Sequence, residues 1–515
     1  MGVEQQLEMQ GRRSPLSALL AQPLPGWACL LGWCAATVLF LVVLHLLGGS
    51  STVDSVESVY STWAIAHGHV ACAFVKPPAD GVSSYAPFTY IAPVYPLLAG
   101  GVAALTHIGS AVPFPSSALG PHCATAVPAI YQWSLRSGAL GQTVVIGDMG
   151  WIVLMFGAIA FVRSTGRGRC GWEVLTVLVL ASLPPVWAAV QTDFHPEDLM
   201  AMGLSLAGLA CALRHRWGWA GVLLALAVLT QQYALLIAAP LLVVAPKKSR
   251  LSFILAAVVT AALVVVPLLQ AASDVPNQVL RAIVLGSGDS SGTGGTLLRE
   301  LHLQGVFLTG ASRVAPIVLS MLLAWWLVRR LGAVVLSPVP LTALFAVSLS
   351  LRLVLEENLR HTYYFMALAV ALVLLDVARG HLRGAVLAWV ALVTLAYDTG
   401  AFLVFSSDIP GAGLRQHLPE ILAVGGLLVI IVDVTRGRFR PYLMAWVALI
   451  MYGFVSWPFI SGPFWSQFPI LFWQLVLVST GIGLAAAPLL SYVRQRSPGR
   501  ARPPAAPALV TVWSV

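Results

Sequence analysis

Two carboxylates follow closely behind a long apolar segment and are well placed for acid–base chemistry. Asp54 and Glu57 lie in the run SSTVDSVESVYSTWAIAHGHV, a few residues beyond the apolar stretch 27–47. A carboxylate just outside a membrane can take the proton of an acceptor hydroxyl if burial raises its pKa towards the working pH. The same spacing fits a helix start, because Asp-x-x-Glu is close to a capping box and acids favour the first turn. The two interpretations are compatible.

A second group of acids surrounds a histidine between two apolar stretches. Its members, in the segment QTDFHPED, are Asp193, His195, Glu197 and Asp198. These residue types can hold a divalent cation or hydrogen-bond a sugar, but a proline followed by two acids is also an ordinary helix start. Metal sites more often show two histidines at helical spacing or carboxylates at alternate positions. We therefore expect substrate contact or helix capping here and predict no metal ligand.

A third polar group combines arginines, acids and aromatic residues. It contains Arg352, Glu356, Glu357, Asn358, Arg360, His361, Tyr363 and Tyr364. The planar donors of arginine match a phosphate, so Arg352, Glu356, Arg360 and His361 are candidate substrate-binding residues. The alternative is an internal Arg352–Glu356 pair one helical turn apart, beside an aromatic belt at a membrane surface.

The remaining polar and sulfur-containing residues suggest no bound cofactor. Asp398 lies within an apolar segment, where an acid is costly in lipid and is expected to face the bundle interior. The glycine-rich run 286–295 lacks the lysine and the strand–helix context of a phosphate loop. Cys72 and Cys123 can pair in a loop outside the cytoplasm. The other four cysteines are interpreted as small apolar packing residues: Cys29, Cys34, Cys170 and Cys211.

Composition determines the class of protein that must position these groups. Only 10 % of the 515 residues are charged and 58 % are hydrophobic, whereas soluble proteins carry about 25 % charged residues. This excludes a soluble enzyme, a disordered chain and a β-barrel of short alternating strands. The net charge of +9 does not indicate nucleic-acid binding, because the basic residues form short clusters between apolar segments. The sequence predicts an all-α, polytopic helical membrane protein.

Apolar segments of membrane-spanning length predict about twelve full crossings. These are 27–47, 145–163, 173–190, 198–214, 251–271, 313–328, 333–351, 362–378, 384–405, 418–434, 441–459 and 469–492. Residues 217–246 lie between two basic flanks and are too short for two spans. They predict a pair of half-length helices that turn near Gln231 and Gln232, and the stretch 91–110 predicts a re-entrant or interfacial helix.

Most of the 29 Lys and Arg residues then fall in alternate loops, which the positive-inside rule assigns to the cytoplasm. Both termini become cytoplasmic: an N-terminal segment 1–26 and a basic, disordered tail 493–515 flank a transmembrane domain 27–492. The long loops 48–144 and 272–312 lie outside, and most acidic residues are on that outer face. Cytoplasmic loops are too short for a nucleotide-sugar domain, so any chemistry is expected outside.

This arrangement resembles the GT-C superfamily of polyprenyl-phosphate-sugar-dependent glycosyltransferases, whose first span precedes a long outer loop with an early acidic residue. The matching features are span 27–47 followed by DSVE (54–57), the Tyr/Pro-rich run 85–98, and the hairpin 218–244. The hairpin is similar to the bacterial mannosyltransferase-like branch, glycosyltransferase family 87.

The resemblance implies a hexosyltransferase, with mannose as one candidate sugar, that needs no cofactor. The donor is a polyprenyl-phosphate sugar and the acceptor a glycan or glycolipid at the outer face of the cell membrane. Asp54 or Glu57 acts as catalytic base, arginines such as Arg352 or Arg360 offset the charge of the leaving phosphate, and the anomeric carbon is inverted. The competing prediction is a transporter or lipid-linked glycan flippase, because broken helices also mark transport sites.

Overall fold

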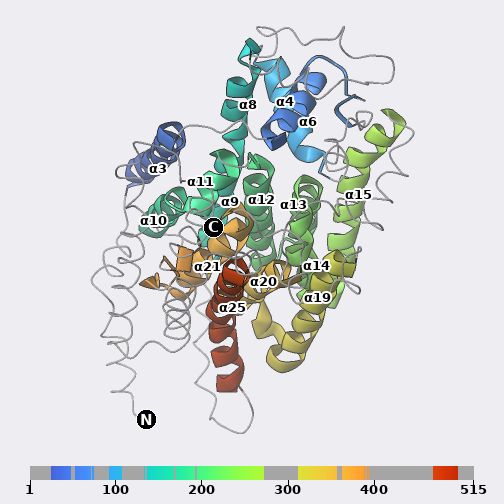
Figure 1. Ribbon diagram of the computed structural model, residues 1–515. Helices are drawn as coiled ribbons and strands as arrows, with labels where there is room; N and C mark the ends of the chain where they lie inside the picture. Colours follow the sequence, from blue (N-terminus) through green and yellow to red (C-terminus); the bar gives the residue numbers. More distant parts are fainter. Residues whose placement is uncertain are drawn as a thin grey trace.

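The computed structural model describes a helical chain in several stretches (Figure 1). The described residues are 25–47, 53–70, 72–74, 92–106, 133, 136–166, 170–191, 194–271, 311–355, 362–384, 386–387, 389–390, 393 and 468–496. Within them all regular structure is helical and no strand occurs. The prediction of an all-α protein is therefore confirmed for this part of the chain.

The α-helices are α3 (Gly26–Leu47), α4 (Val53–Ala66), α6 (Val94–Leu105), α8 (Ala139–Gly147), α9 (Met149–Ser164), α10 (Cys170–Ala181), α11 (Pro184–Gln191), α12 (Pro196–Leu213), α13 (Trp217–Thr230), α14 (Leu235–Val244), α15 (Lys247–Ala271), α19 (Ala311–Leu331), α20 (Pro338–Leu355), α21 (Met366–Arg379) and α25 (Phe468–Arg496). The same described stretches also contain four 3₁₀ turns: η1 (Cys72–Phe74), η5 (Gln232–Ala234), η6 (Gly332–Leu336) and η7 (Thr362–Phe365).

Several of these helices have the length and composition of membrane spans. In the described part, five qualify by themselves, and a sixth is possible if α10 and α11, bent by 61° at their junction, form one broken span. Helices α15 and α19 expose apolar side chains along much of their length, as lipid-facing helices do. Of the twelve predicted spans, 418–434 and 441–459 and most of 384–405 lie outside the described residues. The predicted tail 493–515 is also mostly outside, although α25 continues through Arg496.

The predicted half-length hairpin is present. Helix α13 has 14 residues and is about 21 Å long, too short to cross a hydrocarbon core of about 30 Å. It ends where Gln231 becomes extended (φ −157°, ψ 133°), and the Gln231 side chain accepts a hydrogen bond from the Gln232 N–H at 3.0 Å. The chain returns as α14. The hairpin packs between α12 on one side and α15 and α19 on the other, so its tip reaches into the bundle.

Glycines allow α9 and α12 to cross at close range. A Cβ on Gly157 would overlap the Gly203 carbonyl, and a Cβ on Gly203 would overlap the carbonyl of Val153. Gly150 lies equally close to the Pro196 carbonyl, at the start of α12. Such small-residue crossings are typical of packed membrane helices. They fix the position of the first turn of α12 relative to α9.

Replacing Gly203 by alanine is expected to destabilise the protein by about 1–3 kcal/mol, because the added methyl group must push two backbones apart. The measurement is thermal unfolding of the purified protein in nanodiscs. Gly141→Ala is the matched control, since its Cβ meets no atom within 4 Å and alanine favours a helix by up to about 1 kcal/mol. Equal melting temperatures for Gly203→Ala and the wild type would contradict the close crossing.

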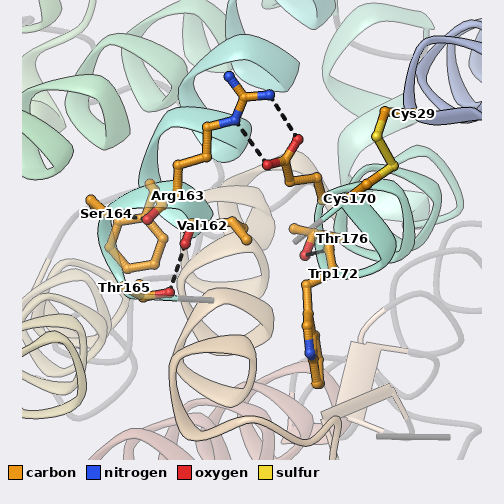
Figure 2. Close-up of polar contacts among 10 residues, drawn as sticks. Cys29, Val162, Arg163, Ser164, Thr165, Cys170, Trp172 and Thr176 are labelled. Carbon is orange, nitrogen blue, oxygen red and sulfur yellow. Dashed lines mark hydrogen bonds and ion pairs between the residues drawn. A yellow bond between two sulfur atoms is a disulfide. The ribbon is translucent and has the colours of Figure 1, made fainter. Parts of the chain in front are cut away.

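A disulfide joins α3 to α10 and corrects one sequence prediction. Cys29 and Cys170, interpreted above as packing residues, are bonded to each other with their Cα atoms 5.4 Å apart (Figure 2). Each lies at the beginning of its helix, and the two helices pack together. A separation of 141 residues hides this proximity from any local pattern. Cys34 and Cys211 are free thiols; Cys211 is half-buried, whereas Cys34, also predicted to pack, is exposed.

An ion pair reinforces the same corner. The Arg163 guanidinium donates two hydrogen bonds, of 2.8 and 3.1 Å, to the carboxylate of Glu173, across the turn between α9 and α10 (Figure 2). The Arg163 guanidinium also lies 5.6 Å from the centre of the Trp33 ring of α3.

Cys72 is disulfide-bonded as well. Its predicted pairing with Cys123 stays a prediction, because Cys123 lies outside the described residues.

Exchanging both Cys29 and Cys170 for serine is expected to lower the free energy of unfolding by about 2–4 kcal/mol, because the disulfide restricts the unfolded chain. Melting of the protein in nanodiscs under non-reducing conditions measures this effect, with Cys34→Ser as the control for loss of a free thiol. Peptide mapping without reductant should recover a Cys29–Cys170 cross-linked peptide. Alkylation of both residues in the unreduced protein would contradict the disulfide.

Candidate functional site

Residues 194–198 of the second polar segment lead into α12. Phe194 adopts a left-handed conformation (φ 51°) and is buried, with its ring beside Gly147. The N–H of His195 donates to the carbonyl of Ala189 in α11, which closes the turn. Pro196 is the first helical residue, as predicted. Non-glycine residues with positive φ are uncommon and are concentrated at functional sites.

Asp198, in the first turn of α12, meets the tip of the hairpin. Its side chain is buried, with 3 % exposed. The Tyr233 hydroxyl of η5 donates to the backbone carbonyl of Asp198 at 2.6 Å, and the Gln231 side chain lies near the Asp198 carboxylate. Arg352 of α20 is close enough to interact with this carboxylate electrostatically. The hairpin thus holds an acid and a cation together well inside the bundle.

Aromatic rings continue from this acid to the start of α21. The Arg352 guanidinium lies 5.1 Å from the centre of the Tyr233 ring and 5.6 Å from that of Tyr364. Tyr364 stacks on Tyr363 at 4.3 Å, and Tyr363 stacks on His195 at 4.4 Å. Cation–π contact places an arginine without neutralising its charge. The guanidinium thus remains a positive charge with planar donors, the side chain that best matches an anion such as a phosphate.

We name this group the acid–aromatic cluster. Its members are His195, Glu197, Asp198, Tyr233, Arg352, Tyr363 and Tyr364. Within it, His195 Nδ1 lies 2.9 Å from Glu197 Oε1. The His195 side chain forms no hydrogen bond that caps α12, whereas Glu197 and Asp198 lie in the first helical turn, as acids at a helix start do. In the part of the chain that the structure describes, no three His, Cys, Asp or Glu side chains are arranged to hold a metal ion.

Three buried oxygen atoms near the cluster have no hydrogen-bond partner among the described residues. They are Glu197 Oε2, Asp198 Oδ1 and the hydroxyl oxygen of Tyr95. Leaving a buried polar group unsatisfied costs about 1–3 kcal/mol, and such groups in proteins are normally satisfied by water or a ligand. The three atoms come from α6 and α12. They indicate where a polar ligand would be bound.

The fold brings together only part of the predicted site. His195, Glu197, Asp198 and Arg352 are collected from two helices into the acid–aromatic cluster. Asp54 and Glu57 lie in the first turns of α4, which packs against α6 at the same end of the bundle, at the top of Figure 1. Four further predicted residues lie outside the described part: Asp193, Glu356, Arg360 and His361. Asp398 is also outside it.

Sequence reasoning did not assign a role to Tyr95, Tyr233 or Gln231. Tyr95 belongs to a short apolar helix, and its burial among α8 and α12 side chains is a tertiary feature. The sequence predicted only that the hairpin turns near Gln231. Polar residues in an otherwise apolar segment were the signal that could have pointed to a role for Gln231 and for the neighbouring Tyr233. One of the two interpretations left open above put Tyr363 and Tyr364 in an aromatic belt at a membrane surface; in the structure they stack within the cluster.

Comparison with known proteins agrees with the resemblance found in the sequence. Residues 140–355 match the profile of Glycosyltransferase family 87. The matched range runs from α8 through α20 and so includes the turn before α12, the hairpin and Arg352. No curated protein matches the chain.

Proposed function

We propose that this chain is a membrane glycosyltransferase that transfers a hexose such as mannose from a polyprenyl-phosphate donor to a glycan or glycolipid acceptor, because residues 140–355 match the profile of Glycosyltransferase family 87. In this proposal the reaction takes place at the outer face of the cell membrane and inverts the anomeric carbon. The competing prediction, a transporter or flippase, gains no support from the family match.

The observation that carries the proposal is the placement of Arg352 in the acid–aromatic cluster. A guanidinium is the side chain best suited to a phosphate, because its planar donors can bind two oxygens at once. Here it lies between two tyrosine rings and beside a buried acid. A lipid-linked phosphate that entered between helices would meet this guanidinium while its sugar contacted the acids and the aromatic rings. In this proposal the phosphate of the donor is complemented by Arg352, and its sugar by the acids and aromatic rings of the cluster.

The orientation of the bundle supports an outer site. The cluster lies where α12 and α21 begin and α20 ends. Basic residues gather at the opposite helix ends, at Arg163, Arg214, Arg216, Lys247, Lys248, Arg329, Arg330 and Arg379. Under the positive-inside rule the basic end faces the cytoplasm, and in this proposal the cluster and α4 therefore face outward. The Cys29–Cys170 disulfide lies at the basic end, and a disulfide at a cytoplasmic surface is unusual.

The proposed reaction is a single displacement. Asp54 or Glu57 accepts the proton of the acceptor hydroxyl as that oxygen forms a bond to the anomeric carbon. The bond between the anomeric carbon and the phosphate oxygen breaks, and the electron pair leaves with the polyprenyl phosphate. Arg352 stabilises the negative charge that develops on this leaving group. The apolar chain of the product remains in the membrane.

The test is transfer of radiolabelled sugar by the purified protein in nanodiscs, supplied with a membrane extract as the source of acceptors. Polyprenyl-phosphate sugars and nucleotide sugars are offered separately, and the Asp54→Asn/Glu57→Gln double variant is the inactive reference. We expect label to move only from a lipid-phosphate donor and only with the wild type. Transfer from a nucleotide sugar in the absence of lipid donor, or no transfer from any lipid donor, would contradict the proposal.

A further inference from the structure

We propose that Tyr95 and Glu197 form the sugar-recognition side of the site and that they select a neutral, hydroxyl-bearing sugar over a carboxylated one. This inference rests on the proposed function, because it specifies the sugar of the same transfer reaction. Tyr95 lies outside residues 140–355, the range that matches the family. Sugar selection would then depend on a segment that precedes the matched part of the chain.

Tyr95 is held rigidly with its hydroxyl buried. Only 3 % of the residue is exposed, and its ring packs in a cluster with Ile146 of α8 and Met200 of α12. The hydroxyl forms no hydrogen bond within the described residues. Its electrostatic neighbours are the carboxylates of Glu197 and Asp148. A tyrosine that only filled space would not require a hydroxyl in this position.

Glu197, in the first turn of α12, offers a hydrogen-bond acceptor near Tyr95. One of its carboxylate oxygens contacts His195 at 2.9 Å, which fixes the orientation of the group. The second oxygen is buried and unpartnered among the described residues. A carboxylate only accepts hydrogen bonds, whereas a tyrosine hydroxyl donates one and accepts others. A ligand that satisfies both must carry groups that donate and accept, as sugar hydroxyls do.

Charge excludes the other ligand classes. A phosphate or a sugar carboxylate placed beside Glu197 would meet a like charge in a buried environment, where repulsion is weakly screened. A metal ion is not favoured, because no suitable ligand group occurs among the described side chains. The anionic part of the donor instead matches Arg352, next to Asp198. The site is thus divided into a phosphate-binding side at α20 and a hydroxyl-binding side at α6 and the start of α12.

The first experiment measures binding without catalysis. Thermal unfolding of the protein in nanodiscs is followed with methyl glucoside, methyl mannoside and methyl galactoside, and with the matching methyl uronides. We expect at least one neutral glycoside to raise the melting temperature more than its uronide does. Tyr95→Phe should abolish that shift, and Glu197→Gln should allow the uronide to stabilise as well as the neutral sugar. Both substitutions keep the shape of the side chain.

Tyr492→Phe is the matched control, because this tyrosine lies at the far end of α25, beside the turn that follows α9. It should behave as the wild type. Equal stabilisation by neutral glycosides and uronides, no stabilisation by any neutral glycoside, or unchanged preferences in both variants would overturn the inference. The last two results would mean that the buried oxygens hold water only.

The second experiment separates this inference from the proposed function. Glucosyl and glucuronosyl polyprenyl phosphates differ only at C6 and are compared as donors. We expect Tyr95→Phe to lower kcat/KM for the neutral donor about tenfold, as loss of one hydrogen bond does. Glu197→Gln should reduce the ratio of kcat/KM for the glucosyl donor to kcat/KM for the glucuronosyl donor. If the wild type transfers sugar but both variants keep its preference, the inference fails and the function stands. If nothing is transferred but glycoside binding depends on Tyr95 and Glu197, the function fails and the sugar site stands.

Discussion

Substitution of Asp54 by asparagine is expected to lower the rate of sugar transfer by about 10²–10⁴-fold, the usual contribution of a general base. Asparagine has the same shape but cannot accept the proton of the acceptor hydroxyl. The loss should appear in kcat, with little change in the KM for the donor, because the proposed base acts on the acceptor. Initial rates with a lipid-phosphate donor at saturating acceptor concentration measure the effect.

Glu57→Gln is the matched comparison, because Glu57 lies one helical turn further along α4 and shares a face with Asp54. If Glu57 is the base, the large loss moves to that variant. The helix-start interpretation makes a different prediction, since acids in a first turn stabilise a helix by about 0.3–1 kcal/mol. A lower melting temperature with normal activity in both variants would show that the two acids only stabilise α4.

Replacing Arg352 by glutamine is expected to reduce kcat by about 10²–10³-fold, as for other groups that stabilise charge in a transition state. The guanidinium lies between Tyr233 and Tyr364 and near Asp198, so it is held where the phosphate charge would develop. Arg352→Lys should recover part of the activity, because lysine restores the charge without the planar pair of donors. The same initial-rate assay in nanodiscs measures both variants.

Arg329→Gln provides the matched control for this prediction. Its guanidinium lies 4.9 Å from the centre of the Trp325 ring, a similar cation–π contact at the opposite end of the bundle. This variant should retain wild-type activity. If Arg352→Gln instead lowers the melting temperature while kcat of the folded protein equals that of the wild type, the arginine only supports the fold and its proposed charge-stabilising role is wrong.

Local patterns were enough to predict much of the architecture. The apolar segments indicated helices, and the basic flanks of residues 217–246 predicted the half-length hairpin, because a stretch of that length cannot cross twice. Pro196 with two following acids marked the start of α12. Arg352 was identified by its chemistry alone, because the planar donors of a guanidinium match a phosphate.

The tertiary structure decided which of these groups meet. The Cys29–Cys170 disulfide, the crossing at Gly157 and Gly203, and the burial of Tyr95 beside Glu197 all join residues far apart in sequence. Such contacts depend on how helices pack, and the hydrophobic pattern of a membrane helix does not specify its neighbour. The sequence by itself therefore determined a helical membrane protein with candidate acids, histidines and arginines. Only the packing of α12, the hairpin and α20 brought four of them, His195, Glu197, Asp198 and Arg352, into one cluster.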